Sequence, residues 1–240
     1  MLVSYFKKFS HQLKISISRC ELCGLNCSDF NLLCNHCHAD LPQFNHALIK
    51  GELLHWPAIH KLINPIKFDS LICLAPYDWP FNTWISQCKY RQRFELSSLM
   101  AQLLAQHWKQ MCDNYDHESP DLVVAVPSHF KRWQERGFNQ AHLIAKKFAK
   151  KTSLPYQKNA LVRLLDTEKQ VGKTGAQRRK NIKGAISINH FVLPAPKHVL
   201  LIDDVITTGS TANEIATVLK SEGVHKVTVM TLCIALPKDI

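Results

Sequence analysis

Residues 199–211 read Val-Leu-Leu-Ile-Asp-Asp-Val-Ile-Thr-Thr-Gly-Ser-Thr. The apolar start predicts a buried parallel strand, and Asp203 and Asp204 stand where that strand ends. The hydroxyl-rich stretch that follows contains Gly209 and predicts a short loop that opens a helix near Ser210 or Thr211. Ligands of open α/β sheets bind at the carboxyl ends of the strands. The stretch therefore predicts an α/β fold with a ligand site at this edge.

The acids and the loop suit two parts of one ligand. Free backbone N–H groups and hydroxyl side chains at a helix N-terminus bind phosphate. Carboxylates instead accept hydrogen bonds from ribose hydroxyls. We expect a ribose 5-phosphate here, with Asp203 and Asp204 on the diol. The residues expected around the phosphate are Thr207, Thr208, Gly209, Ser210 and Thr211. An acidic cap before a helix would explain one Asp but not the whole stretch.

Strand and helix patterns alternate on both sides of this stretch. Apolar runs predict strands at 71–75, 122–126, 161–165, 185–192, 199–202 and 227–235. Apolar residues at helical spacing predict helices that contain 96–111, 144–148 and 212–219, the last one ending near Gly223. This alternation indicates a mainly parallel sheet flanked by helices.

Upstream, two Cys-x-x-Cys pairs stand ten residues apart: Cys20 with Cys23, and Cys34 with Cys37. Four thiolates at this spacing can enclose one Zn²⁺ in a tetrahedron. A closed Cys₄ site leaves no open position, so we expect structural zinc in a small ribbon-like module. Cys27, His36 and His38 are competing ligands that fit the paired spacing less well. Free buried thiols and a redox-active pair are the alternative interpretations.

The predicted domains are an N-terminal helix with the zinc module (1–45), a connector with little regular structure (46–70) and the α/β domain (71–240). The first residues form an amphipathic pattern that packs either on this protein or on a membrane surface or partner. Lysines interrupt any signal-peptide core, and no apolar run approaches 18 residues. We therefore expect no signal peptide and no membrane-spanning helix.

The 240 residues are 46% hydrophobic and 20% charged, which excludes disorder as the dominant state. Lys and Arg number 30 against 19 Asp and Glu, a net charge of +11. The excess is clustered: residues 131–151 hold seven basic and one acidic residue, and 168–183 hold six and one. Such clusters indicate either a polyanionic partner or a solvated basic face. Nine cysteines, an odd number, indicate a reducing, cytoplasmic setting.

The first basic cluster begins in residues 126–141, which follow a predicted strand. They contain Arg132, Arg136 and Gly137, and they predict a basic loop that holds pyrophosphate, because Arg makes bidentate phosphate contacts. The second cluster lies in a polar stretch that predicts a loop able to close over the ligand. Its candidate residues are Thr167, Gln170, Arg178 and Asn181. Gly172-Lys173-Thr174 is not the end of a P-loop, because residue 167 is Thr where that motif needs Gly.

Residues 199–211 resemble the phosphoribosyl-pyrophosphate (PRPP) motif of type I phosphoribosyltransferases. With the cysteine module in front, residues 20–240 resemble the ComF family of competence-associated proteins. The matching positions are Val126-Pro127, Arg136–Gln140, Gln170 and Arg178-x-x-Asn181. The chain departs from the family pattern at Ile182 and Ile186, where the family usually has Val and Phe, and both replacements are conservative.

The resemblance implies a type I phosphoribosyltransferase-like fold, an N-terminal zinc segment, and binding of PRPP with Mg²⁺. It also implies a role in natural transformation and DNA utilization in the cytoplasm, or at the inner face of the membrane. Single-stranded DNA and a competence helicase or other DNA-processing protein are then the expected partners.

Two classes of function stay open. One is a phosphoribosyltransferase with Asp203 and Asp204 as catalytic acids. The other is a non-catalytic PRPP-sensing or single-stranded nucleic-acid-binding protein. In the second class Trp133, Phe138 and Phe148 would stack on bases, although core packing is their alternative role.

Overall fold

The computed structural model of the chain describes residues 19–27, 32–128, 130–163, 186–189, 191 and 196–237, with backbone alone at 130–132. Contacts divide the chain into two units, Met1–Gln43 and Phe44–Ile240. The predicted N-terminal helix lies outside the described residues. Within the described ranges, no helix combines the length and the apolar character needed to cross a membrane.

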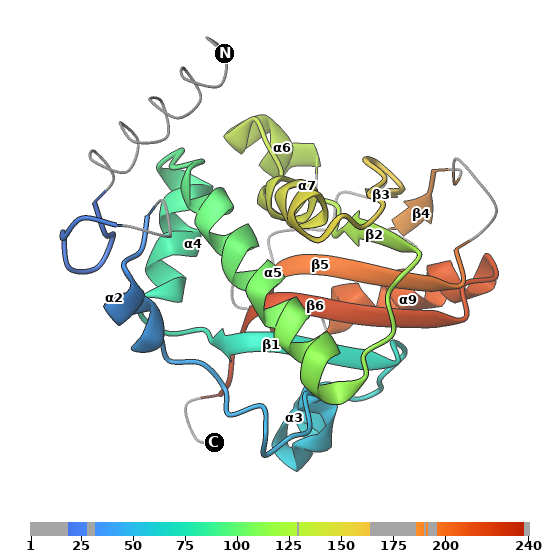
Figure 1. Ribbon diagram of the computed structural model, residues 1–240. Coiled ribbons are helices and arrows are strands. Elements are labelled where there is room, and N and C mark those ends of the chain that lie inside the picture. The colour runs from blue at the N-terminus through green and yellow to red at the C-terminus, as the bar shows by residue number, and fades with distance from the viewer. Residues whose placement is uncertain are drawn as a thin grey trace, which may run out of the picture. The chain divides into compact units, whose positions relative to one another are not determined.

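The larger unit is built on a four-stranded sheet in which every neighbouring pair is parallel (Figure 1). Its strand order is β1-β6-β5-β2. The bounds are β1 (Ser70–Pro76), β2 (Leu122–Ala125), β5 (His198–Ile206) and β6 (Lys226–Ile234). A second, antiparallel pair consists of β3 (Leu161–Arg163) and β4 (Ile186–Ile188). The predicted mainly parallel α/β fold is confirmed.

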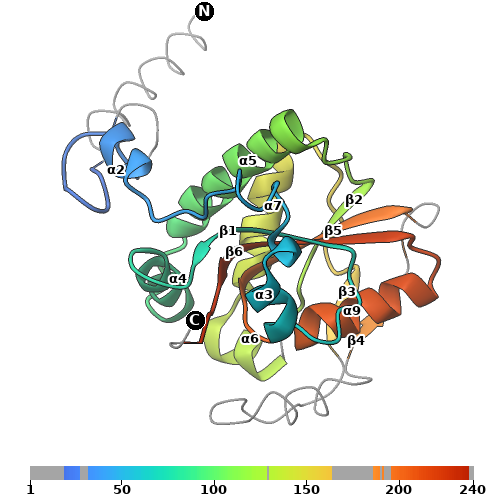
Figure 2. The same ribbon diagram turned by 90° about the horizontal axis from the view of Figure 1, so that it is seen from below.

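Helices cover both faces of the parallel sheet (Figures 1 and 2). α5 (Leu96–Tyr115) and α7 (Gln140–Thr152) lie on one face, and α9 (Ser210–Ser221) lies on the other. Because both faces are covered, Leu200, Leu201 and Ile202 of β5 are all fully buried. This double burial explains why the strand reads as an uninterrupted apolar run.

Residues 46–70 belong to the larger unit and differ from the prediction of a connector with little regular structure. They hold a 3-10 helix, η1 (Leu53–His55), and a helix, α3 (Pro57–Leu62). Pro57 is the first residue of α3, a position where its fixed φ and missing N–H favour a helix rather than break one. Leu53, Ile59 and Ile63 belong to the hydrophobic core shared with β1 and α9.

No element was predicted between 76 and 95, where the structure has α4 (Phe81–Tyr90). This helix follows β1 along the chain, and it buries the apolar side chains of Phe81, Trp84, Ile85 and Cys88. The spacing of these residues is helical, so the signal was present in the sequence.

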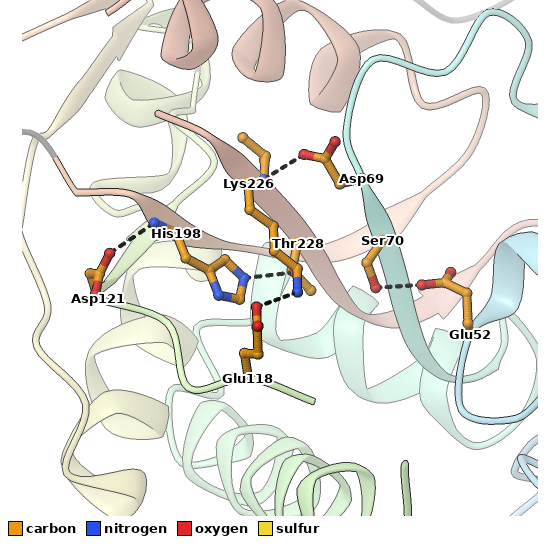
Figure 3. A network of polar contacts seen from close by, with 9 residues as sticks. Glu52, Asp69, Ser70, Glu118, Asp121, His198, Lys226 and Thr228 are labelled. Atoms are coloured by element: carbon orange, nitrogen blue, oxygen red, sulfur yellow. Dashed lines mark hydrogen bonds and ion pairs between the residues drawn. The ribbon is translucent and has the colours of Figure 1, made fainter. Parts of the chain in front are cut away.

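Carboxylates hold the amino ends of the strands, and Figure 3 shows this network. Asp121, just before β2, accepts hydrogen bonds from the backbone N–H groups of Lys197 and His198, both at 2.8 Å. Asp69, just before β1, accepts one from the backbone N–H of Val227 at 2.8 Å. Each edge strand is therefore tied to its central neighbour by an acid that immediately precedes it.

The start of β1 has a further carboxylate partner (Figure 3). Glu52 accepts hydrogen bonds from the Ser70 hydroxyl and, at 2.9 Å, from the backbone N–H of Leu71. Between the central strands, the His198 ring lies 2.9 Å from the Thr228 hydroxyl. These contacts occupy the amino edge of the sheet and leave ligand binding to the carboxyl edge.

Candidate functional site

All four strands of the parallel sheet end at one edge, and polar side chains gather there. A cavity of about 330 Å³ opens at this edge and is named the acidic cavity here. Its volume is in the range of small-molecule sites. Its charged and aromatic walls are Tyr77, Lys89, Arg136, Arg163, Asp203 and Asp204. Two acids thus face three basic residues across one cavity.

The side chains of the two acids of β5 point to opposite faces of the sheet, because successive side chains of a strand alternate between its faces. Asp204 shares its face with Leu200 and Ile202, is only 5% exposed, and hydrogen-bonds Gln140 at the start of α7. It also forms an ion pair with Lys89 of α4, with 2.8 Å between Nζ and Oδ2. Asp203 lines a second, smaller hollow that runs along the 207–212 segment toward α9.

The surroundings shift the pKa values of the two carboxyl groups in opposite directions. Burial acts to raise the pKa of Asp204, but the Lys89 ammonium and hydrogen bonds outweigh it and leave that pKa below its ordinary value. Burial, and then the negative charge on Asp204, raise the pKa of Asp203. Burial opposes the charge on Lys89, yet the two acids raise its pKa above the usual value. Asp204 and Lys89 are therefore the ionised pair, and Asp203 is the acid that an incoming cation would stabilise.

The loop after β5 has the backbone that the sequence predicts. Gly209 has φ +67°, and a Cβ there would lie 2.4 Å from Cγ2 of Ile63. Only glycine adopts this positive φ without strain and also avoids the clash with Ile63. The hydroxyls of Thr208 and Ser210 lie 2.7 Å apart. Gly209 is the N-cap of α9 and supplies no side-chain cap, so the first backbone N–H groups of the helix are available to a ligand.

The position of α9 is fixed from outside the loop. The side chain of Asn213 accepts a hydrogen bond from the backbone N–H of Lys67 at 2.6 Å and donates one to the carbonyl of Pro65 at 2.7 Å. These contacts tie the first turn of the helix to the segment that leads into β1. The predicted phosphate-binding loop is thus held at Gly209, which lies against Ile63, and at the first turn of α9, through Asn213.

The basic stretch after β2 is not the open loop that was predicted. Its central part forms α6 (Phe130–Arg136), and the side chain of Arg132 lies outside the described residues. Arg136 closes this helix and lines the acidic cavity. Its guanidinium donates to Gln140 at 3.3 Å and to the Tyr90 hydroxyl at 3.2 Å, and it lies 4.9 Å from the centre of the Tyr90 ring. Arg136 is therefore oriented by neighbours on two helices.

The residues after Arg136 shape the turn into α7. Gly137 has φ +76°, which suits a residue without a Cβ. Phe138 packs edge-on against Phe94, with 4.6 Å between ring centres. Asn139 donates to the carbonyl of Val126 at 2.9 Å and accepts from the backbone N–H of Ala141 at 3.0 Å, capping α7. The motif thus joins the end of β2 to the helix that carries Gln140.

The predicted closing loop lies outside the described residues. Its candidates are Thr167, Gln170, Arg178 and Asn181. The two strands that flank it, β3 and β4, pair with each other, with Leu161 opposite Ile188 and Arg163 opposite Ile186. The ends of the segment are therefore held side by side.

Three residues of the acidic cavity were missed by sequence reasoning: Tyr77, Lys89 and Arg163. Tyr77 follows β1 directly, two residues beyond the predicted strand 71–75. Arg163 ends β3 and lies inside the predicted strand 161–165. Lys89 lies one residue after Cys88, within the overlooked helical pattern of α4. The signal for Lys89 was therefore the helix that carries it, since nothing in the sequence paired it with Asp204.

In the smaller unit, the Sγ atoms of Cys20, Cys23, Cys34 and Cys37 lie within 4.8 Å of one another. The second pair surrounds the start of α2 (Asn35–Ala39), where the backbone N–H of Cys37 points to the Cys34 sulfur at 3.5 Å. This arrangement could hold a metal ion, and four sulfur donors suit Zn²⁺.

The competing residues do not join this group. Cys27, His36 and His38 are not among the side chains whose donor atoms converge, within the part of the chain that the structure describes. Cys27 is buried, and burial together with the nearby cysteines raises its pKa to about 11. It therefore behaves as a buried thiol.

The aromatic residues proposed to stack on bases differ in exposure. Phe148 is fully buried in α7 and packs in the core. Phe138 is partly buried against Phe94, whereas Trp133 on α6 is 51% exposed. Of the three, only Trp133 presents a large accessible ring.

Comparison with known proteins agrees with this geometry. Residues 96–238 match the model of the phosphoribosyl transferase domain family. Competence protein F of Haemophilus influenzae is 30% identical over 210 residues, which cover 84% of this chain and 90% of that protein. DNA utilization protein YhgH of Escherichia coli K12 is 30% identical over 215 residues, 89% of each chain. Competence protein ComFC of Bacillus subtilis is 33% identical over 102 residues, 42% of this chain and 39% of that one.

The family match includes α5, α7, β2, β5 and the loop at the start of α9, and so contains most of the acidic cavity. The matched relatives extend the similarity over most of the chain. The chain belongs to the phosphoribosyl transferase domain family and, within it, to the competence protein F and YhgH group.

Proposed function

We propose that the acidic cavity binds PRPP together with Mg²⁺. The observation that carries the proposal is the last part of β5, where two carboxylates are followed by the short loop that opens α9 with free backbone N–H groups. The loop of residues 207–211 would bind the 5-phosphate through backbone N–H groups and hydroxyls. Asp203 and Asp204 would accept hydrogen bonds from the ribose diol.

The basic wall of the cavity suits the pyrophosphate. Arg136 and Arg163 line the cavity beside the end of β2, and an arginine can contact a phosphate through two N–H groups. Bound Mg²⁺ would neutralise part of the pyrophosphate charge, with oxygen ligands from the substrate and few from the protein. Asp203, whose pKa is raised by burial, would ionise more readily beside that cation.

As an enzyme, the chain would transfer the phosphoribosyl group. The bond between ribose C1 and pyrophosphate would break, and C1 would bond to an acceptor nucleophile. The two acids would stabilise the positive charge that develops on the ribose, and the basic wall would stabilise the departing pyrophosphate.

Calorimetric titration with PRPP, with and without Mg²⁺, tests this site. We expect micromolar binding that depends on Mg²⁺ and is lost when Asp203→Asn and Asp204→Asn are combined. Asp113→Asn, an exposed acid on α5, is the matched control and should bind normally. Unchanged affinity in the double variant would remove the assignment. A folded wild-type protein that binds no PRPP would do the same.

A second candidate function is binding of single-stranded DNA without catalysis, or PRPP sensing by an accessory protein of DNA uptake. The observation that favours it is a set of exposed aromatic side chains on the elements around the cavity: Tyr77, Trp79, Tyr90, Phe94 and Trp133. Exposed rings next to basic residues suit base stacking and phosphate contact. A helicase or other DNA-processing protein would then be the protein partner, in the cytoplasm or at the inner face of the membrane.

Fluorescence anisotropy with labelled oligothymidylate tests this candidate. Affinity should fall steeply and log-linearly as salt rises, because phosphate contacts release counterions. Binding that is absent at low salt, or insensitive to salt, excludes it. The two functions are compatible, so the PRPP titration and the DNA titration are independent tests.

For the smaller unit we propose one structural Zn²⁺ on Cys20, Cys23, Cys34 and Cys37. The converging sulfur atoms support this proposal, and metal analysis of the purified protein tests it.

A further inference from the structure

A second cavity lies next to the acidic cavity and has a different lining. Its volume is about 620 Å³, and it is named the Trp133 cavity here. The two cavities share Pro127, Ser128, Asn139 and Arg163 as walls. Of the residues to which the PRPP proposal assigns a role, the Trp133 cavity includes only Arg163, so most of its lining needs its own explanation.

Aromatic rings from three parts of the fold line the Trp133 cavity. Trp133 comes from α6, Phe138 from the turn after it, and Tyr156 from the segment that follows α7. Phe138 is held by its edge-on contact with Phe94. Trp133 lines the cavity and is half exposed. Flat rings around one cavity favour a flat ligand.

The polar groups of the Trp133 cavity are suited to neutral donors and acceptors. The Tyr156 hydroxyl lies 2.5 Å from Nδ1 of His142. Burial raises the pKa of Tyr156 to about 12. Burial, and then Lys158 and Lys146, lower the pKa of His142. The phenol and the imidazole therefore share their hydrogen bond as neutral groups.

Asn159 and Asn189 are two of the four side-chain amides in the lining, beside Asn139 and Gln157. Asn159 stands just before β3 and Asn189 just after β4, and the backbone N–H of Asn189 bonds to the carbonyl of Ala160 at 2.9 Å. Within the described part of the chain, neither side-chain amide has a hydrogen-bond partner. Each offers a donor and an acceptor side by side, the pattern with which Asn reads the edge of a base. Lys158, beside them, is exposed and cationic.

We propose that the Trp133 cavity is a binding site for a nucleoside 5′-monophosphate. The base lies among Trp133, Phe138 and Tyr156 and is read by the amides of Asn159 and Asn189. The phosphate lies toward Lys158. A volume of about 620 Å³ accommodates such a ligand. The site does not depend on PRPP binding, because it uses other side chains.

The test is calorimetric titration of the full chain with adenosine 5′-monophosphate, without PRPP. We expect saturable binding that weakens about tenfold or more in Trp133→Ala, as loss of base stacking does. Asn189→Leu should weaken it comparably. Leu48→Ala is the control, since Leu48 is an exposed apolar side chain (81%) that lines neither cavity. Its affinity should equal that of the wild type.

Competition separates this site from the acidic cavity. Ribose 5-phosphate, which the PRPP proposal places on the 207–211 loop, should not displace the nucleotide, and Asp203→Asn with Asp204→Asn should not weaken it. Displacement, or loss of binding in that double variant, would place the nucleotide in the acidic cavity and overturn the proposal. Absence of binding by the wild type, equal binding by Trp133→Ala, or competition by inorganic phosphate alone would also overturn it.

Discussion

Lys89 of α4 and Asp204 of β5 form an ion pair in the acidic cavity, with 2.8 Å between Nζ and Oδ2. The two elements are far apart in the sequence, because α4 comes before α5 and β5 comes after α7. Both side chains are largely buried, at 19% and 7% exposure. The pair fixes which of the two acids of β5 is ionised. It also joins α4 to the central sheet at the point where the ligand is proposed to bind.

Replacing Lys89 with Met should leave Asp204 as a buried charge without its cation. We expect a loss of about 3 kcal/mol in the free energy of unfolding, because breaking a buried pair strands one charge. The pKa of Asp204 should rise in the variant. Urea denaturation measures the first effect and NMR titration the second.

Lys220→Met is the control for this experiment. Lys220 pairs with Asp69 at 2.7 Å, but both side chains are about one-third exposed. Removing such a pair costs less than about 1 kcal/mol. Equal losses in the two variants would show that burial of the Lys89 pair has no energetic consequence.

Gly209→Ala should destabilise the protein and weaken PRPP binding together. The added Cβ meets Ile63 at 2.4 Å, and φ +67° disfavours an L-residue. We expect a loss of about 2–4 kcal/mol in the free energy of unfolding. Gly223→Ala is the matched control, because φ is +91° there but nothing lies within 4 Å of the added atom. Ile63→Ala should recover part of the loss in Gly209→Ala, and a purely additive double variant would contradict the proposed clash.

The pair of histidines in the larger unit should make the fold sensitive to acid. His107 is 2% exposed, and its ring centre lies 4.3 Å from that of His46. Burial, and then His46 and His117, lower the pKa of His107 from 6.5 to about 3. Between these values the unfolded chain binds a proton that the folded chain does not. The free energy of unfolding should therefore fall as pH drops below 6.5, by up to about 1.4 kcal/mol per pH unit for this group.

His107→Leu removes this group, so the free energy of unfolding should fall less steeply as the pH drops below 6.5. His60→Leu, on the exposed side of α3, controls for the loss of a histidine as such. Chemical denaturation between pH 4 and pH 7 measures both curves. A His107→Leu curve parallel to that of the wild type would show that the ring is protonated freely in the folded state.

Cys37→Ser should abolish metal retention by the smaller unit. Three sulfur donors remain in that variant, and a closed tetrahedral site requires four ligands. Metal analysis should give one zinc per wild-type chain and much less in the variant. Cys112→Ser, on α5 in the larger unit, should retain full zinc. Loss of zinc from Cys27→Ser would show that Cys27 is a ligand, contrary to the convergence of the other four sulfurs.

The sequence was most informative where one short stretch carries both the fold and the chemistry. Residues 199–211 predicted the strand, its acids, the loop and the start of α9, because each follows from local residue types. The same holds for the paired cysteines. Long elements such as α5 were also predictable, since their apolar periodicity extends over many turns.

The sequence did not predict contacts between residues that are far apart in the chain, or helices that are too short to show a clear period. The pairing of Lys89 with Asp204 exists only after α4 packs near the end of β5. Leu53 and Ile59 looked like parts of an irregular connector because η1 and α3 are too short for a clear period. The basic stretch before Arg136 predicts a loop because its charged residues give no apolar period that would indicate the short helix α6. The Trp133 cavity is lined by segments that share no sequence motif.

The order of strands in the sheet has a consequence for how the chain is made. β1 and β2 lie at the two edges, whereas the central β5 and β6 come from the last part of the sequence. On the ribosome, the edge strands emerge first. β2 has no neighbour to pair with until β5 has left the exit tunnel, and β1 has none until β6 has left it. Asp69 and Asp121 are then already placed one residue ahead of those edge strands, ready to align the late-arriving centre. The sheet is therefore complete only after its two central strands have emerged, and until then the apolar surfaces of α5 and α7 need protection by other means.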